Sequence, residues 1–248
     1  MQERAMRANA ETESDPEATV RQGESAPALK LAKVSRVDSL GDQAVSSLRG
    51  ALRRGALSPG QRLTVREIAD TLDISLTPAR EALNRLLAEG VLDQTPDRVA
   101  IVPRLTKQSY GEICAIRLGL EAMAAREGCA RLSEADLARL GELYERHTVA
   151  YRSRDARTSL RLNEEFHFTI YRASAMPILL QILETMWLKV GPSMNLLFTA
   201  SYDPDWRGGT HHRAMLGAIA AGDPIALEQA VTGDLVDGRA RLMPHLPD

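Results

Sequence analysis

Apolar residues recur at helical spacing along most of the chain. The first such pattern covers residues 38–54, where Leu40, Ala44, Leu48 and Leu52 repeat every four positions and predict an amphipathic helix. Arg49, Arg53 and Arg54 are left on its outward side. Two further short helices are predicted over 65–72 and 78–89. Residues 92–102 then predict a β-hairpin with its tip at 94–98.

The third predicted helix carries clear start and stop signals. Thr77 is a good N-cap, and Pro78 at the first helical position loses no hydrogen bond, because its missing N–H would have no partner there. Gly90 is a residue type that commonly ends a helix. Arg80 and Arg85 project from the side opposite the apolar residues. A short helix of this kind, with arginine near its start, suits the major groove of DNA.

After Pro103 the pattern is helical throughout, with breaks that outline about six helices over residues 105–245. No strand-like alternation and no internal repeat stands out, so an antiparallel helical bundle is the economical architecture. The predicted fold is mostly α: an N-terminal winged helix-turn-helix of three helices and a β-hairpin (35–104), then an all-α bundle (105–248). Residues 1–34 lack apolar periodicity and are predicted to be a disordered tail.

Composition narrows the class of protein. The chain has 248 residues, 44% hydrophobic and 26% charged, as expected for two modest globular domains. No apolar run approaches the roughly 18 to 20 residues that span a bilayer, so no membrane association is expected. Cys114 and Cys129 lie far apart without C-x-x-C spacing, which fits a reducing cytoplasm. Residues 35–104 hold ten arginines and nine acidic residues, so a basic surface there requires charges gathered on one face.

Several fixed spacings identify a family. PGQRL at 59–63, SLTPAREALNRL at 75–86, EG at 89–90 and PDRV at 96–99 resemble the DNA-binding domain of the GntR transcription regulators, in their FadR-like branch. The sequence departs from the family pattern twice. Leu76 stands where the family has arginine, and Val99 stands where it has the glycine of the wing tip. The valine predicts a wing tip that needs no positive φ.

Five residues are predicted to contact double-stranded DNA. Arg80 is expected to reach a guanine, and the resemblance implies a further contact from Arg66. Ser75 and Thr77 can donate to phosphates, and Arg98 is expected at the minor groove or a phosphate. Leu76 predicts weaker affinity or an apolar contact with a thymine methyl group. One such domain makes too few contacts for selective binding, so a homodimer reading two half-sites is expected.

Polar residues fall on the inward faces of the later helices. Asn163 and His167 share one inward stripe, while His212 and Asp234 lie on the apolar stripes of two later helices. A buried polar group costs on the order of 1 to 3 kcal/mol unless it finds a partner. These four side chains are therefore expected to bind something or to bond one another.

The second half resembles the FCD-type effector-binding domain that follows the winged helix in FadR-like regulators. The resemblance rests on Ile116-Arg117 with Glu121, on Asn163-x-x-Phe-His167 and on the segment that begins at His212. Many FCD domains hold a divalent metal with an Asp-x-x-x-His pair and two later histidines, and the effector, often a carboxylate, completes the coordination. Matched by position, the ligands here are Asn163, His167, His212 and Asp234, with Zn, Ni or Mn as the candidate ions.

Alternatives remain open at these positions. The histidines can equally be core residues with satisfied hydrogen bonds, and a neutral amide makes Asn163 a poor metal ligand. His211 competes with His212, which only the resemblance favours. Arg117 either forms an ion pair with Glu121, four residues on, or faces the cavity and clamps an effector carboxylate.

The sequence predicts a cytoplasmic, ligand-responsive DNA-binding transcriptional regulator. Its expected partners are double-stranded DNA, a small effector, such as an organic acid, and a second copy of the chain. The alternatives are a constitutive DNA-binding dimer without an effector, and a metal-dependent enzyme. The sequence carries no nucleophile motif and no phosphate loop, so an enzyme is not expected.

Overall fold

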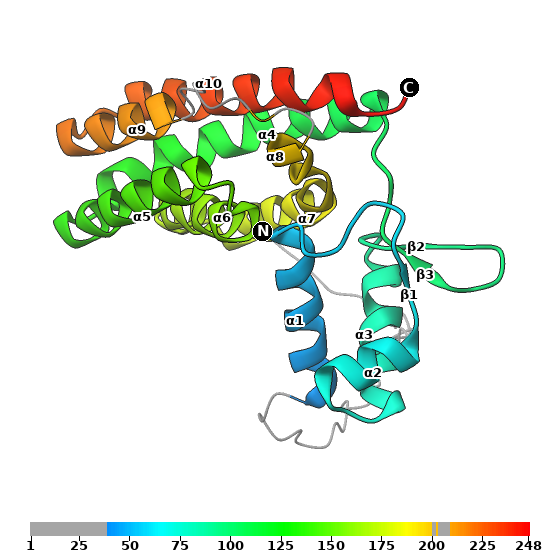
Figure 1. The fold of residues 1–248 in the computed structure, drawn as a ribbon. Helices are drawn as coiled ribbons and strands as arrows, with labels where there is room; N and C mark the ends of the chain where they lie inside the picture. Colours follow the sequence, from blue (N-terminus) through cyan, green and yellow to red (C-terminus); the bar gives the residue numbers. More distant parts are fainter. Residues whose placement is uncertain (1–38, 200–201, 203–208) are drawn as a thin grey trace, which may run out of the picture. The chain divides into compact units, whose positions relative to one another are not determined.

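The computed structural model describes residues 39–199, 202 and 209–248, and the predicted tail (1–34) lies outside them. The described residues are mostly helical, with one small antiparallel sheet near the N-terminal end (Figure 1). No helix among them is long and apolar enough to cross a membrane.

The N-terminal part is a winged helix-turn-helix. Its elements are α1 (Leu40–Arg53), β1 (Arg62–Leu63), α2 (Val65–Leu72), α3 (Leu76–Ala88), β2 (Asp93–Gln94) and β3 (Ala100–Ile101). The sheet has the order β1-β3-β2, and both pairings are antiparallel. The three helices and the hairpin are confirmed. β1 was not foreseen, because two residues carry no periodic signal.

Local signals start and stop these helices. A capping box between Ser39 and Asp42 opens α1, and another between Thr64 and Glu67 opens α2. Gly90 has φ of 64° and follows α3, which confirms its predicted role as a helix stop.

The predicted start of α3 was wrong by two residues. Ser75, not Thr77, is the N-cap, and Pro78 is the third helical residue rather than the first. The proline is tolerated because the N–H groups of the first turn have no partner within the helix. The shift places Leu76 at the exposed tip of the helix, where half of its surface is accessible.

The wing tip also differs from its prediction. The turn between β2 and β3 does use a positive φ, but at Arg98 (φ 62°) rather than at Val99. The Thr95 side chain holds the turn together, because its hydroxyl both donates to the Val99 carbonyl and accepts from the Val99 N–H, each at 3.0 Å. The residue with positive φ is therefore Arg98, one position before Val99.

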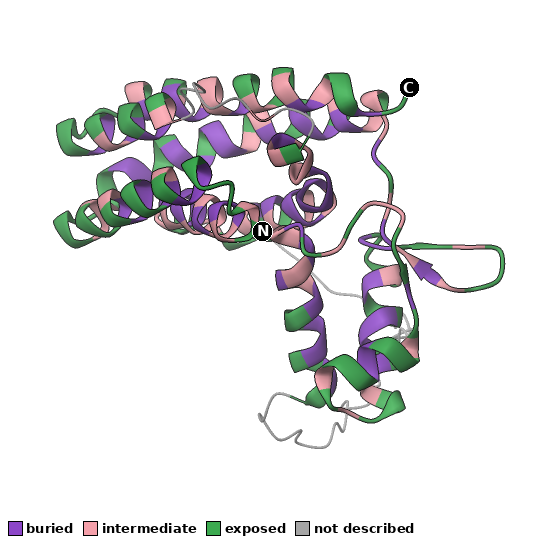
Figure 2. Cartoon of the chain, in the orientation of Figure 1, coloured by how far each residue is buried: buried purple, intermediate pink, exposed green. Residues whose placement is uncertain are grey.

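The C-terminal part is the predicted helical domain. Its helices are α4 (Lys107–Gly128), α5 (Glu134–Arg152), α6 (Ala156–Arg172), α7 (Pro177–Met194), α8 (Leu196–Thr199), α9 (Gly209–Ala221) and α10 (Pro224–Leu242), with 3₁₀ turns at Cys129–Arg131 and Met243–His245. The prediction of about six helices is confirmed, with α8 as a short addition. α4 packs along α10, and α5 packs along both α6 and α9. Figure 2 shows buried residues along the facing sides of these helices.

Helix α7 also contacts the winged helix. Leu188 packs into the core formed by α1, α2 and α3. Gly191 lies so close to the end of α1 that a Cβ atom there would meet the Leu52 carbonyl oxygen at 2.4 Å. Arg53 was predicted to face outward, but its Nε lies 2.8 Å from Glu164 Oε1 on α6. A packed contact thus joins the two parts at the end of α1.

Candidate functional site

Helix α3 presents a polar, exposed face. Thr77 and Arg80 are exposed on it, while Ala79, Leu83 and Leu86 are buried in the core behind. Arg80 makes no hydrogen bond or ion pair with any residue that the structure describes. Arg85 differs, since it contacts Asp42 and Glu89. Arg80 is therefore the arginine of this helix whose donors are available to another molecule.

The other predicted DNA contacts are also exposed. Ser75 makes no side-chain hydrogen bond with the helix that it caps, so its hydroxyl is available to a phosphate. Arg66 on α2 and Arg98 on the wing are exposed. Sequence reasoning overlooked Asn84, which is exposed one helical turn after Arg80. An asparagine at that spacing can bond an adenine edge, and the i, i+4 relation to Arg80 would have found it.

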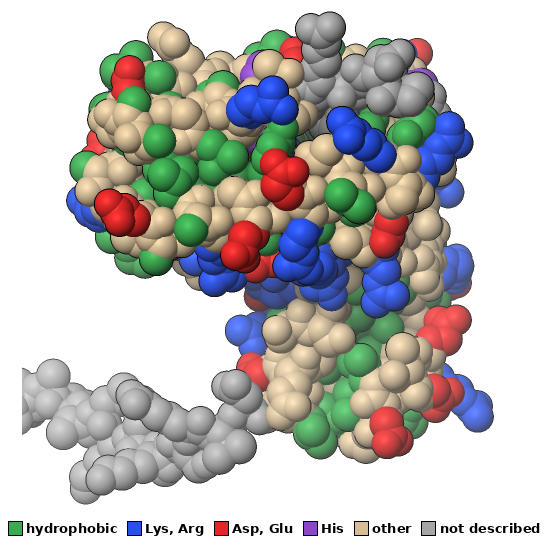
Figure 3. Space-filling view, turned by 60° about the vertical axis from the view of Figure 1, so that its left-hand side comes forward, with side chains coloured by type: hydrophobic (Ala, Val, Ile, Leu, Met, Phe, Trp, Pro, Cys, Tyr) green, Lys and Arg blue, Asp and Glu red, His purple; other side chains and the backbone are tan. Residues whose placement is uncertain are grey.

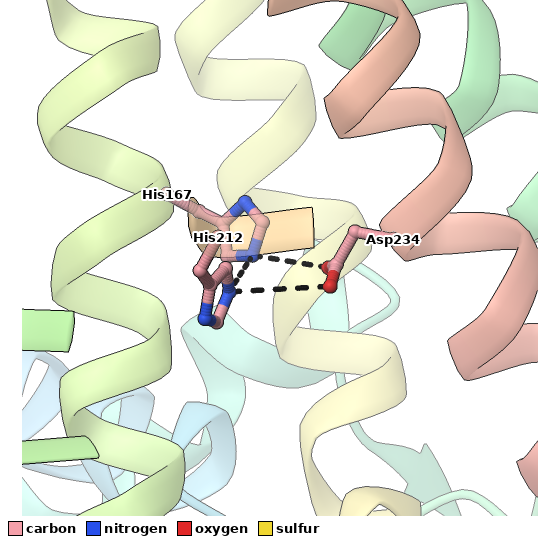
Figure 4. Close-up of side chains that lie close together, drawn as sticks. All are labelled: His167, His212 and Asp234. Atoms are coloured by element: carbon pink, nitrogen blue, oxygen red, sulfur yellow. Dashed lines mark hydrogen bonds and ion pairs between the residues drawn. The ribbon is translucent and has the colours of Figure 1, made fainter. Parts of the chain in front are cut away.

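A second cluster lies inside the helical domain. His167 on α6, His212 on α9 and Asp234 on α10 turn their polar atoms toward one another (Figure 4). The Nε2 atoms of the two histidines are 3.2 Å apart. Asp234 Oδ2 lies 3.2 Å from His167 Nε2, and Asp234 Oδ1 lies 4.0 Å from His212 Nε2. Both histidines are only 1% exposed.

These distances fit a shared cation. Ligand atoms at the Zn–N and Zn–O lengths found in tetrahedral sites lie about 3.3 Å from one another. Two of the three separations here, both 3.2 Å, are close to that spacing, and the third is 4.0 Å. The cluster combines two imidazole nitrogens with one carboxylate, a donor set that zinc, nickel and manganese accept. Nδ1 of His212 is buried without a hydrogen-bond partner among the described residues.

The protonation states suit such a site. Burial lowers the pKa of His212 to about 3 against the opposing charge of Asp234, so this imidazole is neutral at physiological pH. Burial alone would raise the pKa of Asp234, but the contact with His167 and the other imidazoles nearby bring that pKa below its usual value. A neutral imidazole and a charged carboxylate bind a cation without first losing a proton.

Neither the fourth predicted ligand, Asn163, nor the alternative histidine, His211, belongs to the cluster. Asn163 is half-buried on α6 and lines a cavity beside the cluster, which Asp234 also lines. His211 lies outside the cluster, with its Nε2 2.6 Å from Asp237 Oδ2 at the surface. The geometry therefore brings together His167, His212 and Asp234.

Arg117 forms the ion pair that was one of its two readings. It is 5% exposed, and its Nε donates to Glu121 Oε1 at 2.7 Å. Its guanidinium also lies 4.8 Å from the centre of a Trp187 ring. It lines a small cavity with Arg53, Asn163 and other residues, but not the larger cavity that reaches Asp234. Arg117 thus lines a different cavity from the one that Asp234 lines.

The larger cavity has an empty volume of about 440 Å³, open solvent at its mouth included. Sequence reasoning overlooked two of its polar residues. His147 on α5 is buried, which lowers its pKa to about 4, and its ring lies 5.2 Å from that of His212. The hydroxyl of Ser159 on α6 is buried and has no hydrogen-bond partner among the described residues. Ser159 lies four residues before Asn163 and eight before His167, a spacing that points to one helical face.

An exposed arginine-bearing helix on a winged domain, joined to a helical domain with a cavity and a metal-ligand cluster, defines the class of one-chain, ligand-binding DNA regulators. Residues 40–100 match the model of the bacterial regulatory proteins of the gntR family, and residues 112–236 match that of the FCD domain. The chain belongs to the GntR family of transcriptional regulators and carries an FCD domain.

Curated relatives and solved structures agree with this assignment. The chain is 36% identical over 186 residues to the HTH-type transcriptional regulator McbR of Escherichia coli K12, covering 75% of this chain and 84% of McbR. It is 30% identical over 182 residues to a probable D-xylose utilization operon transcriptional repressor of Paenarthrobacter nicotinovorans, covering 73% and 79%. The solved structure of E. coli McbR/YncC superposes with a TM-score of 0.79 at 32% identity, over 84% of this chain and 98% of that one. These relatives are named as transcriptional regulators, which agrees with the expectation that the chain is not an enzyme.

Proposed function

We propose that this regulator binds a two-fold related operator as a homodimer and that a small organic acid, held beside a divalent metal in the FCD domain, controls the binding. The observation that carries the ligand part is the convergence of His167, His212 and Asp234 at the side of a cavity. A bound divalent ion would supply an electrophilic anchor for the effector's carboxylate.

The DNA-reading part rests on the free donors of the winged domain. Arg80 and Asn84 share one face of α3, and the free hydroxyl of Ser75 lies at the start of the same helix. Arg80 is proposed to bond a guanine, with Ser75 and Thr77 on phosphates. Arg66 and Arg98 add contacts from α2 and the wing.

The lining of the cavity indicates what kind of acid it holds. Ser159, Asn163 and neutral His147 are uncharged hydrogen-bonding groups of this lining. The lining also contains the charged Asp234 and Arg241 and apolar side chains such as Leu160 and Phe198. Such a wall suits a short acid that carries hydroxyl or carbonyl groups rather than a plain hydrocarbon tail. A ligand hydroxyl near Ser159 would satisfy the orphaned hydroxyl, whose burial otherwise costs about 1 to 3 kcal/mol.

Helix α6 supports a route from ligand to DNA. It carries His167 at the cluster and, one turn earlier, Glu164, which pairs with Arg53 at the end of α1. A shift of α6 on ligand binding would therefore displace α1, which packs against α3. Couplings of this kind are typically 1 to 3 kcal/mol.

The dimer would use apolar surface of the helical domain. Ile116 and Met123 are exposed, two turns apart on α4, with Gly119 between them in open space. Figure 3 shows hydrophobic side chains gathered on one face of this part of the molecule, among charged ones. Analytical ultracentrifugation of the full chain tests this step, and a monomer at micromolar concentration would contradict it.

The experiment for the whole proposal combines selection and binding. Duplexes are selected from a random-sequence pool with the full-length protein. The affinity for the selected duplex is then measured with and without Zn²⁺ and a panel of short hydroxy and oxo acids. We expect an inverted repeat and at least one acid that changes affinity about 5- to 150-fold. A selected duplex without two-fold symmetry, or a DNA affinity that no acid of the panel changes, contradicts the proposal.

Gly238 provides a test of the cavity, and Gly217 provides its matched control. Gly238 lines the cavity from α10, and a Cβ atom there would meet no atom within 4 Å. Gly238→Leu should therefore fill the cavity without clashing and abolish the response to the acid, while DNA affinity of the ligand-free protein stays the same. Gly217→Leu, at an exposed position on α9 that is also open, should leave the response intact.

A further inference from the structure

A chain of buried hydrogen bonds connects the cluster of His167, His212 and Asp234 to residues of α4 and α7. His167 Nδ1 lies 3.0 Å from the Tyr171 hydroxyl, and that hydroxyl lies 2.7 Å from Glu121 Oε2. The other oxygen, Glu121 Oε1, accepts from Arg117 Nε at 2.7 Å and from Trp187 Nε1 at 2.8 Å. Tyr171, Glu121 and His167 are each at most 1% exposed.

The donors and acceptors of this chain can be ordered in only one way. The Arg117 and Trp187 groups have N–H and no acceptor, so both must donate. As a carboxylate, Glu121 only accepts hydrogen bonds, so the Tyr171 hydroxyl must be the donor in the bond between them. The Tyr171 hydroxyl lies 2.7 Å from Glu121 Oε2, as expected for a hydroxyl that donates to a carboxylate.

This order of donors and acceptors fixes which ring nitrogen of His167 carries a hydrogen. Since the Tyr171 hydroxyl donates to Glu121, it can only accept from the ring, and Nδ1 must carry a hydrogen. In a neutral imidazole the lone pair is then on Nε2. That atom is the one that faces Asp234 Oδ2 and His212 Nε2, each at 3.2 Å.

We infer that Arg117, Glu121 and Tyr171 are positioning residues that hold His167 in the Nδ1–H form, with Nε2 presented to a divalent cation. Outer groups that fix a ligating imidazole in this way commonly change metal affinity 10- to 100-fold when they are lost. The inference deepens the proposed function by giving Arg117 a role through Glu121 rather than on the effector.

The direct test is the tautomer of His167 in the full-length protein. Long-range ¹H–¹⁵N correlation spectra, assigned by comparison with His167→Gln, distinguish a protonated from a bare ring nitrogen. We expect a protonated Nδ1 both before and after addition of Zn²⁺. A bare Nδ1 overturns the inference.

Two substitutions test the chain from its other members. Tyr171→Phe keeps the ring and removes the hydroxyl, so Zn²⁺ affinity, measured by competition with a chelating dye, should fall about 10- to 100-fold. Tyr110→Phe is the matched control: Tyr110 is equally buried but lies in a different part of the core and should leave the affinity unchanged. Unchanged affinity in Tyr171→Phe overturns the inference.

Glu121→Gln makes a sharper prediction. Its amide oxygen can still accept from Arg117 and Trp187, so its NH₂ group would face Tyr171 and donate. Tyr171 would then donate to His167 Nδ1, and the proton would move to Nε2, where it blocks the cation. A folded Glu121→Gln protein that keeps Nδ1 protonated contradicts the ordering. If the unpaired charge of Arg117 unfolds this variant, the wild-type spectrum and Tyr171→Phe decide.

The outcomes separate this inference from the proposed function. If wild-type protein takes up no Zn²⁺ in equilibrium dialysis, the metal part of the proposed function fails. The spectrum of His167 still decides whether the chain orders the ring, because it is read without metal.

Discussion

The two parts of this chain treat their polar side chains in opposite ways. On the winged domain, Arg80, Ser75 and Asn84 are exposed and have free hydrogen-bonding groups. In the helical domain, His167, Tyr171 and Glu121 are fully buried and bond one another. Free groups on a surface suit a large partner that brings its own donors and acceptors. A buried network suits a small ligand that must be held in one geometry.

Removing the charge of the buried cluster should have the largest effect. Asp234→Asn keeps the size of the side chain but loses the one carboxylate among the three ligand atoms. We expect Zn²⁺ affinity to fall by more than the roughly 100-fold seen when outer groups are lost. Zn²⁺ should then no longer raise the melting temperature. DNA affinity of the metal-free protein should stay the same.

Asp237→Asn is the control for that experiment. Asp237 lies on the same helix, exposed and paired with His211 outside the cluster. Its loss should leave Zn²⁺ affinity unchanged. Equal losses from both substitutions would show that the ion is bound elsewhere on α10.

The free groups of α3 provide the next test. Arg80→Ala removes the proposed guanine contact, worth about 1 to 3 kcal/mol, so affinity for the selected operator should fall roughly 5- to 150-fold per half-site. Fluorescence anisotropy at fixed salt measures it. Arg139→Ala, exposed on α5, changes the charge equally and should have little effect. A similar loss on random duplex would mean that Arg80 contacts phosphate rather than a base.

The sequence predicted most elements of the first part to within a few residues, and fewer features of the second. The bounds of α2 were predicted without error, because a capping residue and an apolar stripe both lie within the segment. The start of α3 was missed, because Ser75 and Thr77 are both residue types that cap helices and the sequence alone does not choose between them. Short-range signals thus fix the elements to within a few residues.

The network of the helical domain joins residues that local patterns cannot connect. His167, His212 and Asp234 were named from helical stripes and the family resemblance. His147 and Ser159 were not, because a single polar residue on a helix gives no sign of which cavity it faces. Tyr171 and Glu121 are 50 positions apart, and their bond exists only because α4 packs against α6. Only the structure shows which group donates and which group accepts at each bond of that chain.

The contact between the two parts can be loosened at one atom. Gly191→Ala would place a Cβ 2.4 Å from the Leu52 carbonyl and 2.8 Å from Arg53 Cα, so the helices must separate. Overpacking of this kind costs about 1 to 3 kcal/mol. We expect a lower melting temperature and a weaker effect of the acid on DNA affinity. Gly217→Ala, with open space around it, should be neutral or stabilising by about 0.5 to 1 kcal/mol. Full ligand control in Gly191→Ala would mean that the signal does not cross this contact.

Leu76 gives the prediction with the smallest expected effect. It is an apolar residue on a surface whose polar groups are otherwise free to bind DNA. It is 51% exposed at the first position of α3. Leu76→Arg introduces the residue type that the family resemblance implies there, and it should strengthen operator binding several-fold. A new phosphate contact would steepen the salt dependence by about 0.9 per contact, whereas a new base contact would change the preferred sequence. Leu40→Arg adds the same charge at an equally exposed leucine on α1 and controls for general attraction. If Leu76→Arg changes neither affinity nor preference while the salt slope stays constant, position 76 does not meet the DNA, and the first turn of α3 lies outside the groove.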